Sequence, residues 1–411
     1  ESYKCKGNKR KIWLAVGVTL NLGLLGFFKY SNFFVENINA VLISFGVESL
    51  EWTKIALPIG ISFFTFQKMS YIIDVYRNEK PPMKSFVDYS LYILFFPQLI
   101  AGPIIRFNEV ADQIRDRKEQ ETIDNKLVGF FRFCIGLAKK VLIANTMGAT
   151  ADAIFQLDPT AISTSMAWMG VIAYAFQIYF DFSGYSDMAI GIARMVGFIF
   201  PENFDNPYTS QSISEFWRRW HMTLSRWMKD YLYISLGGNK VKTKFRLFFN
   251  LWLVFLISGF WHGAAWNFIV WGAFHGFFLI MDRLFLLKFY SIIGKLPSIA
   301  ITFVLTLIGW VLFRAESLEH ALEYIKSMFS VKFSLVSYSY GKEFWLILIF
   351  AVLFSFNRIF PWGKKLEEFF FGTDVPVKKV IFLSIFCVFV YILCVSFVTS
   401  SGFNPFIYFR F

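Results

Sequence analysis

Long apolar stretches recur along the whole chain and constrain its fold more than any other feature. The longest of them would cross the ~30 Å hydrocarbon core of a bilayer as helices, and we expect roughly eight to eleven membrane elements. Soluble bundles do not need so many fully apolar helices. The candidate membrane segments are Ile12–Phe28, Leu91–Ile105, Met166–Phe180, Leu247–Trp261, Ala264–Met281, Ile299–Phe313, Phe344–Phe356 and Val380–Val398.

Composition supports the same class. Apolar residues make up 56% of the 411 residues and charged residues 17%, whereas soluble domains have about 45–50% and 25%. The net charge of +12 is spread between the apolar segments, so we expect anionic lipid and not nucleic acid as its partner. The four cysteines form no CxxC pair. Cys387 and Cys394 are expected to fill space on one helix face, without a disulfide framework.

Two of the apolar segments are interrupted. Tyr179–Asp187 contains two carboxylates and a glycine, and Gly102-Pro103 breaks the Leu91–Ile105 run. We expect both segments to bend or unwind, because proline removes a backbone donor and glycine loosens a helix. Irregular backbone at membrane depth survives only where protein or a water-filled cavity surrounds it. The predicted fold is therefore an all-α, polytopic transmembrane helical bundle with re-entrant or interfacial helices around a central tunnel.

The distribution of Lys and Arg predicts orientation. Residues 141–193 contain neither, so the Asn145–Thr164 stretch is expected to face outward. Pro201–Arg246 contains eight cations and is expected to face the cytoplasm. The basic segment Glu1–Lys11 leads directly into Ile12 and has the character of a loop between two spans. We therefore expect further helices upstream of Glu1.

His262 is the ionisable residue that most directly suggests chemistry. It follows the apolar run Leu251–Trp261 and precedes Gly263. Burying an ionisable group there costs free energy, so such residues usually have a function. Desolvation keeps an imidazole neutral, and a neutral imidazole can take the proton of a hydroxyl that attacks an ester or thioester. The alternative is a structural histidine that is hydrogen-bonded to a neighbouring helix.

His221 lies in a segment with a helical pattern. Ser212 and Glu215 have capping-box spacing, and from there to Tyr231 the pattern predicts one basic amphipathic helix at the cytoplasmic interface. Either the histidine is incidental, or the helix dips into the bilayer and turns His221 toward the tunnel. The cations of the helix would then attract an anionic donor. The apolar stripe comprises Trp217, Trp220, Leu224, Trp227, Met228 and Tyr231.

The remaining ionisable residues point less clearly to function. His275 would lie about 220° from His262 on one straight helix, so we expect a structural or supporting role for it. His320 lies in a polar segment and is expected to be solvated. Asp181 and Asp187 could mark an ion path in a transporter, but we favour hydrogen-bonded structural anchors. The sequence has no Walker, dinucleotide, HExxH, GxSxG or Cys/His metal motif.

A set of motifs follows one order along most of the chain. They are Leu57–Gln67, Tyr71–Arg77, Phe96–Pro103, Tyr179–Ile190, Glu202–Tyr208, Glu215–His221, Tyr231–Asn239 and Trp261–Gly263. In combination they resemble the membrane-bound O-acyltransferase family, and within it the bacterial branch of the alginate and peptidoglycan O-acetylation membrane subunits. Family members usually have about two helices before the position of Ile12. The resemblance therefore implies that residues 1–411 form a single membrane domain that lacks about two N-terminal helices.

The resemblance also implies the site. His262 in Trp-His-Gly and His221 in Trp-Arg-Arg-Trp-His would be catalytic and would meet at a tunnel that is open to both sides. No metal or tightly bound cofactor is expected. The residues expected to contact substrate are Trp217, Arg218, Trp220, Trp261, Asp181 and Tyr185.

Two functions follow as hypotheses. The first is an acyltransferase of the bacterial inner membrane. It would pass an acyl group, usually acetyl, from a cytoplasmic thioester such as acetyl-CoA toward an extracytoplasmic polysaccharide such as alginate or peptidoglycan. In the branch that the chain resembles, a partner of the SGNH esterase type often completes the transfer. The alternative is a transporter for the acyl donor, lined by Asp181 and Asp187, with the chemistry left to a partner protein.

Overall fold

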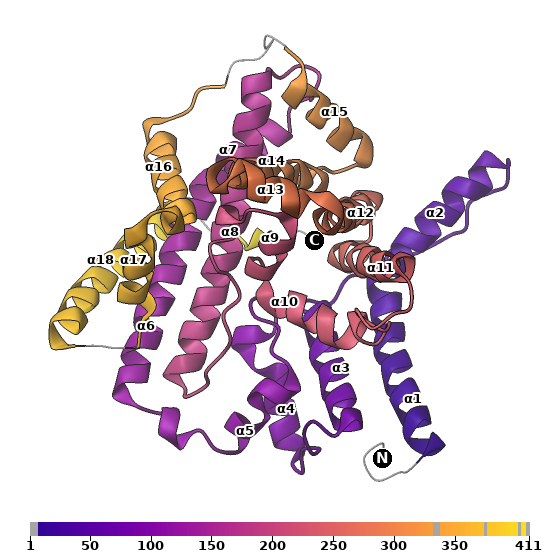
Figure 1. The fold of residues 1–411 in the computed structure, drawn as a ribbon, viewed down its shortest axis with the longest axis horizontal. Helices are drawn as coiled ribbons and strands as arrows, with labels where there is room; N and C mark the ends of the chain where they lie inside the picture. The colour runs from indigo at the N-terminus through magenta and orange to yellow at the C-terminus, as the bar shows by residue number, and fades with distance from the viewer. Residues whose placement is uncertain (1–6, 332–337, 374–375, 402–403, 408–411) are drawn as a thin grey trace.

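The computed structural model describes residues 7–331, 338–373, 376–401 and 404–407, and within these ranges every regular element is helical (Figure 1). The predicted all-α class is confirmed. The first part of the chain forms α1 (Asn8–Leu25), α2 (Ser31–Ser44), α3 (Ile61–Arg77), α4 (Phe86–Leu94), α5 (Phe107–Arg115), α6 (Ile123–Ala138), α7 (Asn145–Phe155), α8 (Thr164–Met195) and α9 (Ile213–Arg219). The second part forms α10 (Met222–Trp227), α11 (Lys244–His262), α12 (Trp266–Met281), α13 (Leu287–Ile293), α14 (Lys295–Arg314), α15 (Leu318–Phe329), α16 (Lys342–Phe356), α17 (Pro361–Phe371) and α18 (Val377–Ser401).

Side-chain caps explain many of the helix starts. The residue before the helix is a serine or threonine whose oxygen accepts a backbone N–H of the first turn, which otherwise has no partner. Such caps begin α4, α6, α8, α9, α11 and α15, and are formed by Ser85, Thr122, Ser163, Ser212, Thr243 and Ser317. The predicted capping role of Ser212 is confirmed, since its side chain accepts the N–H of Glu215 at 3.1 Å.

Fewer helices than expected could span a bilayer on their own. Among the described residues, four are long and apolar enough, and the pair α16–α17, bent by 107°, would be a fifth if it forms one broken span. The segment Leu91–Ile105 does not form one spanning helix, because α4 ends at Leu94 and a 3-10 turn and irregular backbone follow it. The four are Asn8–Ser44, Lys244–His262, Lys295–Arg314 and Val377–Ser400.

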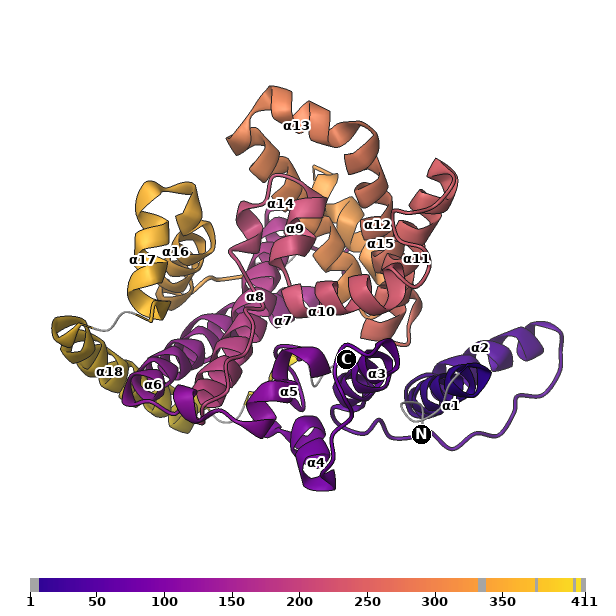
Figure 2. The same ribbon diagram turned by 60° about the horizontal axis from the view of Figure 1, so that its bottom comes forward.

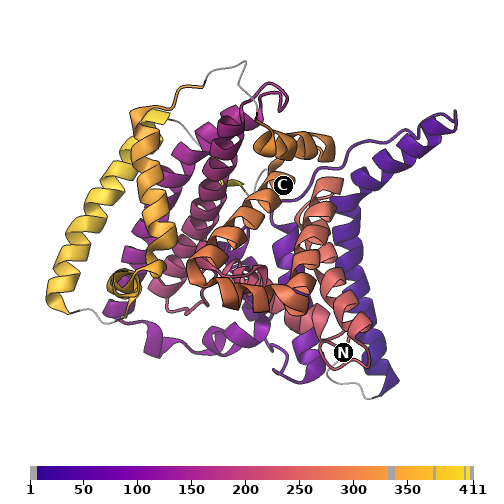
Figure 3. The same cartoon turned by 45° about the horizontal axis from the view of Figure 1, so that its top comes forward.

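The helices form a central body with two outer arms. α8 packs against α6 and α7, and α11 packs against α12. The N-terminal helical stretch of α1 and α2 lies at one edge, and α16–α18 lie at the opposite edge (Figures 2 and 3). α18 contacts α6, and α1 contacts α3. Cys387 and Cys394 are buried on α18 as free thiols, which agrees with the space-filling role expected of them.

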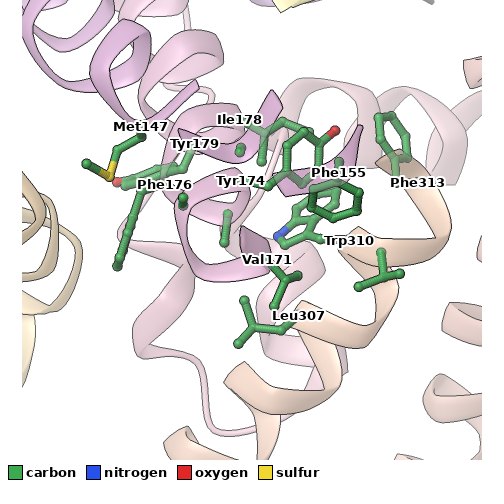
Figure 4. Packing of buried hydrophobic residues seen from close by; sticks show 14 of the residues in the cluster. Met147, Phe155, Val171, Tyr174, Phe176, Ile178, Tyr179, Leu307, Trp310 and Phe313 are labelled. Carbon is green, nitrogen blue, oxygen red and sulfur yellow. The ribbon is translucent and has the colours of Figure 1, made fainter. Parts of the chain in front are cut away.

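The central body is packed with aromatic rings. Figure 4 shows side chains of α14, among them Trp310 and Phe313, facing side chains of α8 such as Tyr174. Trp310 is 2% exposed and Tyr174 is fully buried. This cluster packs α14 against α8, and Trp310 and Phe313 at its edge also line a small cavity.

The predicted bend at Tyr179–Asp187 was wrong, because α8 is one continuous helix. Glycines let α6 and α8 approach until their backbones touch. A Cβ atom on Gly136 would lie 2.6 Å from the carbonyl oxygen of Gly184, as is common for small residues between membrane helices. Basic side chains of the α6 region therefore reach the carboxylates of α8. Because these basic side chains from a neighbouring helix pair with the carboxylates, α8 does not have to unwind.

The predicted break at Gly102-Pro103 is confirmed. No α-helix is formed between α4 and α5, and Gly102 adopts a φ of 92°. A Cβ atom there would lie 3.1 Å from the ring of Tyr185, so both the dihedral and the contact favour glycine. The irregular backbone leaves the N–H of Ile104 free, and it donates to the side chain of Thr223 at 2.9 Å.

The predicted single helix from Ser212 to Tyr231 was also wrong. α9 ends at Arg219, and α10 begins at Met222. Between them His221 has the left-handed dihedrals φ 44° and ψ 54°. The predicted apolar stripe is nevertheless buried on both sides of the break. Distant hydrogen bonds cause the break, since the carbonyl oxygen of Asn203 accepts the N–H of Met222 at 2.9 Å.

Candidate active site

His262 lies inside a ring of aromatic side chains at the end of α11. Ring centroids of Trp261, Trp271 and Phe313 lie 4.9, 5.1 and 5.4 Å from its imidazole. The residue still keeps some accessible surface, and it lines a small cavity. Gly263 follows in extended conformation, and a Cβ atom there would lie 2.1 Å from the ring of Phe268. Glycine is therefore required for the chain to leave α11 at this point.

The space that His262 faces is a small cavity of about 20 Å³. A cavity needs about 10–15 Å³ to hold one water molecule, so this one has room for little more. Its wall is almost wholly apolar. The lining residues are Ile178, Phe182, Trp220, His262, Trp271, Trp310, Phe313 and Ile407.

His221 is held at the break between α9 and α10, where it is only 1% exposed. Its Nδ1 atom lies 2.9 Å from Oδ1 of Asn203. Its Nε2 atom is buried and has no hydrogen-bond partner among the described residues. The ring of Phe182 packs edge-on against it, with the centroids 4.7 Å apart.

The two histidines approach each other from different parts of the fold. Phe182 contacts the imidazole of His221 and also lines the cavity that His262 faces. The two imidazoles are close enough to interact electrostatically. The structure thus brings together the two residues that the sequence singled out, although they are 41 positions apart. Their assignment as catalytic stays a prediction.

A hydrogen bond from another helix anchors the segment that carries His221. Asp282, directly after α12, accepts the N–H of Ser214 in the first turn of α9 at 2.7 Å. A carboxylate at this end also complements the partial positive charge of a helix N-terminus. Burial raises the pKa of Asp282, and the hydrogen bond from Ser214 acts in the opposite direction.

The helix that carries His262 is capped by residues of the N-terminal helical stretch Asn8–Ser44. The last carbonyl groups of a helix have no partners within the helix. At the end of α11, Lys29 donates to the carbonyl oxygens of Trp261 and His262, and the hydroxyl of Tyr30 donates to that of Phe260 at 3.0 Å. Both residues belong to the π-helical turn Gly26–Tyr30 between α1 and α2. A cation at a helix C-terminus is also favoured by the helix dipole.

We therefore expect Lys29→Met to loosen the end of α11. The free energy of unfolding in detergent should fall by about 2 kcal/mol, because a charged hydrogen-bond donor is lost from partly buried carbonyl groups. Lys54→Met is a matched control in the same region of the chain. Its salt bridge to Glu36 is largely exposed, with side chains 78% and 59% exposed, so its loss should change little. Equal effects of the two substitutions would contradict the capping role.

Of the four aromatic and basic residues expected to contact substrate from α9, its end and α11, only Trp220 lines the cavity of His262. Trp261 stacks on Phe66 with centroids 4.9 Å apart, and Trp217 packs against Trp271 and His275. The side chain of Arg218 is exposed. Their role in substrate binding stays a prediction.

Asp181 and Tyr185 lie on α8, beside the end of the described chain. Asp181 is ion-paired with Lys140 and accepts the N–H of Ile407 at 2.9 Å. The ring of Tyr185 packs edge-on against Phe406, with the centroids 5.0 Å apart. Both residues therefore position the segment whose Ile407 lines the cavity. This segment gave no signal in the sequence, because it is short and far from the histidines along the chain.

Asp187, the second carboxylate of α8, is also paired. It accepts from Arg132 at 3.0 and 2.8 Å and from Lys139 at 2.6 Å. Arg132 pairs in turn with Glu202. Both carboxylates that suggested an ion path are thus held by cations from α6 and the turn that follows it, as structural anchors would be.

The other two histidines differ in burial. His275 is 1% exposed and packs against Trp271, which also contacts His262. It lies on α12 and His262 on α11, so the argument from one straight helix does not apply. His320 was expected to be solvated, but it is half-buried. Within the described part of the chain, no group of three or more His, Cys, Asp or Glu side chains could hold a metal ion.

A larger cavity of about 710 Å³ lies between the central body and the α16–α18 arm. Its lining is mostly apolar, and Arg132, Lys139, Asp187 and Glu202 form a polar part of the wall. Asn203, the partner of His221, belongs to the same wall. His221 therefore lies one side chain away from this cavity.

Known proteins of one family are similar to this chain. The family model described as MBOAT, membrane-bound O-acyltransferase family, matches residues 14–293, which include both histidines. A probable alginate O-acetylase of Azotobacter vinelandii is 50% identical over 319 residues, which are 77% of this chain and 63% of that protein.

More distant relatives carry other names. A peptidoglycan O-acetyltransferase of Helicobacter pylori is 43% identical over 347 residues, covering 78% of this chain and 65% of that protein. A teichoic acid D-alanyltransferase of Streptococcus thermophilus is 31% identical over 244 residues, covering 56% and 58%. The chain thus spans less than two thirds of the length of each of these relatives.

Proposed function

Since this chain belongs to the membrane-bound O-acyltransferase family, we propose that it passes an acyl group, most simply acetyl, from a cytoplasmic thioester toward hydroxyl groups of an extracytoplasmic polysaccharide. Acetyl-CoA is the first candidate for the donor. The named relatives that act on alginate and peptidoglycan support a polysaccharide acceptor. They are bacterial proteins, which supports a location in the bacterial inner membrane.

The observation that carries this proposal is the closeness of two imidazoles, one of which lines a small cavity. Isolated buried histidines are common, but His221 and His262 come from separate elements and lie close together, with Phe182 packing on His221 and lining the cavity of His262. Proton transfer by a positioned imidazole is the usual aid to the attack of a hydroxyl on an acyl group. Membrane proteins seldom keep ionisable groups at such depth without a function.

The reaction requires one bond to form and one to break at the acyl carbon. The hydroxyl oxygen of the acceptor attacks the carbonyl carbon of the thioester, and its proton passes to an imidazole nitrogen of the histidine pair. The C–S bond then breaks, and the thiolate takes up a proton. We assign the general acid–base role to His262, with His221 sharing the proton or orienting a substrate.

The surroundings suit the charge that develops on the carbonyl oxygen. Trp271 lines the cavity, and its indole N–H has no partner among the described residues. A buried N–H of this kind can donate to an oxyanion in a site of low dielectric constant. The acyl group and acceptor need more room than 20 Å³, so a tunnel through the site has to widen when substrates bind. A partner of the SGNH esterase type, outside the membrane, would complete transfer to the polymer.

The test is a transfer assay with the full-length protein reconstituted in liposomes. Acetyl-CoA labelled in the acetyl group is supplied on one side, and a soluble oligosaccharide acceptor on the other. We expect label to appear on the acceptor or on an added partner protein. Movement of intact acetyl-CoA across the membrane, without any transfer of the acetyl group, would instead support a transporter.

A further inference from the structure

The hydrogen bonds around His221 determine which of its two nitrogens carries the proton. The imidazole has two neutral tautomers, and the identity of the atom facing Nδ1 selects between them. That atom belongs to the side-chain amide of Asn203, whose oxygen and nitrogen ends must be told apart by their other partners. Asn203 is 1% exposed, so its hydrogen bonds are made within the protein.

Thr223 identifies the end of the amide that faces His221. The backbone N–H of Thr223 points at this atom from 3.4 Å, and its hydroxyl oxygen lies 2.8 Å from it. The hydroxyl already accepts the N–H of Ile104 at 2.9 Å, which leaves its own proton to donate. Two donors of Thr223 therefore meet the same atom of Asn203, and that atom must be the acceptor oxygen Oδ1.

The opposite end of the amide agrees with this assignment. Nδ2 of Asn203 lies 2.9 Å from the hydroxyl oxygen of Ser186 on α8, which can accept from it. The backbone carbonyl of Asn203 also accepts the N–H of Met222, and so fixes the residue that directly follows His221. Asn203 is thus fixed by both its side chain and its backbone.

From this network we infer that Asn203 is a positioning residue that holds His221 as its Nδ1–H tautomer, with Nε2 presented as the acceptor. Nδ1 faces an oxygen at 2.9 Å and must therefore donate. In the neutral ring Nε2 then carries the lone pair, and it is the buried nitrogen that has no partner among the described residues. On the proposed function, His221 enters the reaction by accepting a hydrogen bond or proton at Nε2.

The left-handed backbone of His221 belongs to the same arrangement. A non-glycine residue pays a conformational cost for such dihedrals, and no glycine or proline lies next to it in the sequence. The hydrogen bonds of Asn203 to Met222 and Thr223 secure this conformation directly after His221. The same residue therefore sets both the direction and the tautomer of the imidazole.

The direct test is nitrogen NMR of the full-length protein, labelled with ¹⁵N in histidine and held in lipid bilayers without substrate. His221→Gln identifies the signals of this residue. We expect a protonated Nδ1 and a bare Nε2 for His221. The reverse pattern in the unchanged protein would overturn the inference, and this result needs no variant of Asn203 to fold.

Substitutions test whether Asn203 is the cause. Asn203→Leu removes the acceptor and should release His221 to a mixture of tautomers. Acyl transfer should then fall roughly ten- to hundredfold, mainly in kcat, since a hydrogen bond that presents a reacting group is lost. Ser186→Ala is the matched control, because it removes a bond of the same amide but leaves Oδ1 in place. It should keep the His221 signals unchanged.

The outcomes separate this inference from the proposed function. If the tautomer is as inferred but no preparation transfers an acyl group, the function fails and the positioning role of Asn203 stands. If transfer is observed while Nε2 carries the proton, the inference alone fails. Unchanged His221 signals in Asn203→Leu would also overturn it.

Discussion

Replacing His262 with glutamine is expected to reduce acyl transfer roughly 100- to 10,000-fold, the usual contribution of general acid–base catalysis. Glutamine is close to histidine in volume and polarity, so the aromatic cage of Trp261, Trp271 and Phe313 should stay filled. It cannot exchange a proton near neutral pH. Transfer is measured with labelled acetyl donor in liposomes, and the amount of folded protein by size-exclusion chromatography in detergent.

His320→Gln is the control for this substitution. His320 is half-buried on α15 and stacks near Tyr324 with centroids 6.5 Å apart, and it does not line the cavity of His262. We expect transfer at the rate of the unchanged protein. If His262→Gln also transferred at that rate, His262 would not be the acid–base group, and the buried histidine would have to be structural.

The second large effect concerns stability. Lys140 and Asp181 form an ion pair whose side chains are only 7% and 4% exposed. Lys140→Met leaves the carboxylate buried with the N–H of Ile407 as a remaining partner. Removing one member of a buried pair costs about 3–5 kcal/mol, because the other charge stays desolvated. We expect a loss of this size in the free energy of unfolding, measured by denaturant titration in detergent micelles.

Two further variants show whether the buried charge is the cause. The double substitution Lys140→Met with Asp181→Asn removes both charges and keeps an acceptor for Ile407, so it should recover most of the loss. Lys139→Met is the matched control one residue earlier. Its partner Asp187 keeps Arg132 at 2.8 Å, so a smaller loss is expected. Equal losses for the two lysines, or no recovery in the double variant, would contradict the explanation.

Features with a local cause could be predicted from the sequence. Gly102-Pro103 breaks the helix because of its own backbone chemistry, and Ser212 caps α9 through a bond three residues away. The apolar stripe from Trp217 to Tyr231 follows from helical spacing, and it is buried as predicted. The two histidines could be chosen from their apolar surroundings and motifs, and the structure brings them together.

Features with a distant cause could not be predicted. The carboxylates in Tyr179–Asp187 suggested an unwound helix, because their partners Arg132, Lys139 and Lys140 lie about 40 to 55 positions earlier in the chain. Likewise the break at His221 has no signal in the residues next to it. It follows from hydrogen bonds to Asn203, which the sequence places in an ordinary polar loop.

Lys29 was missed for a similar reason. A lysine at the end of the apolar run Ile12–Phe28 has the pattern of an anchor at the membrane interface, whose charge would reach water. In the structure its ammonium group instead caps the carbonyl end of α11. Nothing near Lys29 in the sequence indicates that this partner lies more than two hundred positions away.

The size of the cavity beside His262 bears on how much of the acyl donor would be lost to hydrolysis. A thioester held next to an imidazole can be lost to hydrolysis whenever water reaches the acyl carbon. A space of about 20 Å³ lined by aromatic and aliphatic side chains admits about one water and gives it few polar partners. Exclusion of water protects reactive acyl groups in closed active sites. On the proposed function, the cavity widens to bind its substrates, and the apolar side chains of Phe182, Trp220 and Ile407 would limit how much water enters with them and so favour transfer over hydrolysis.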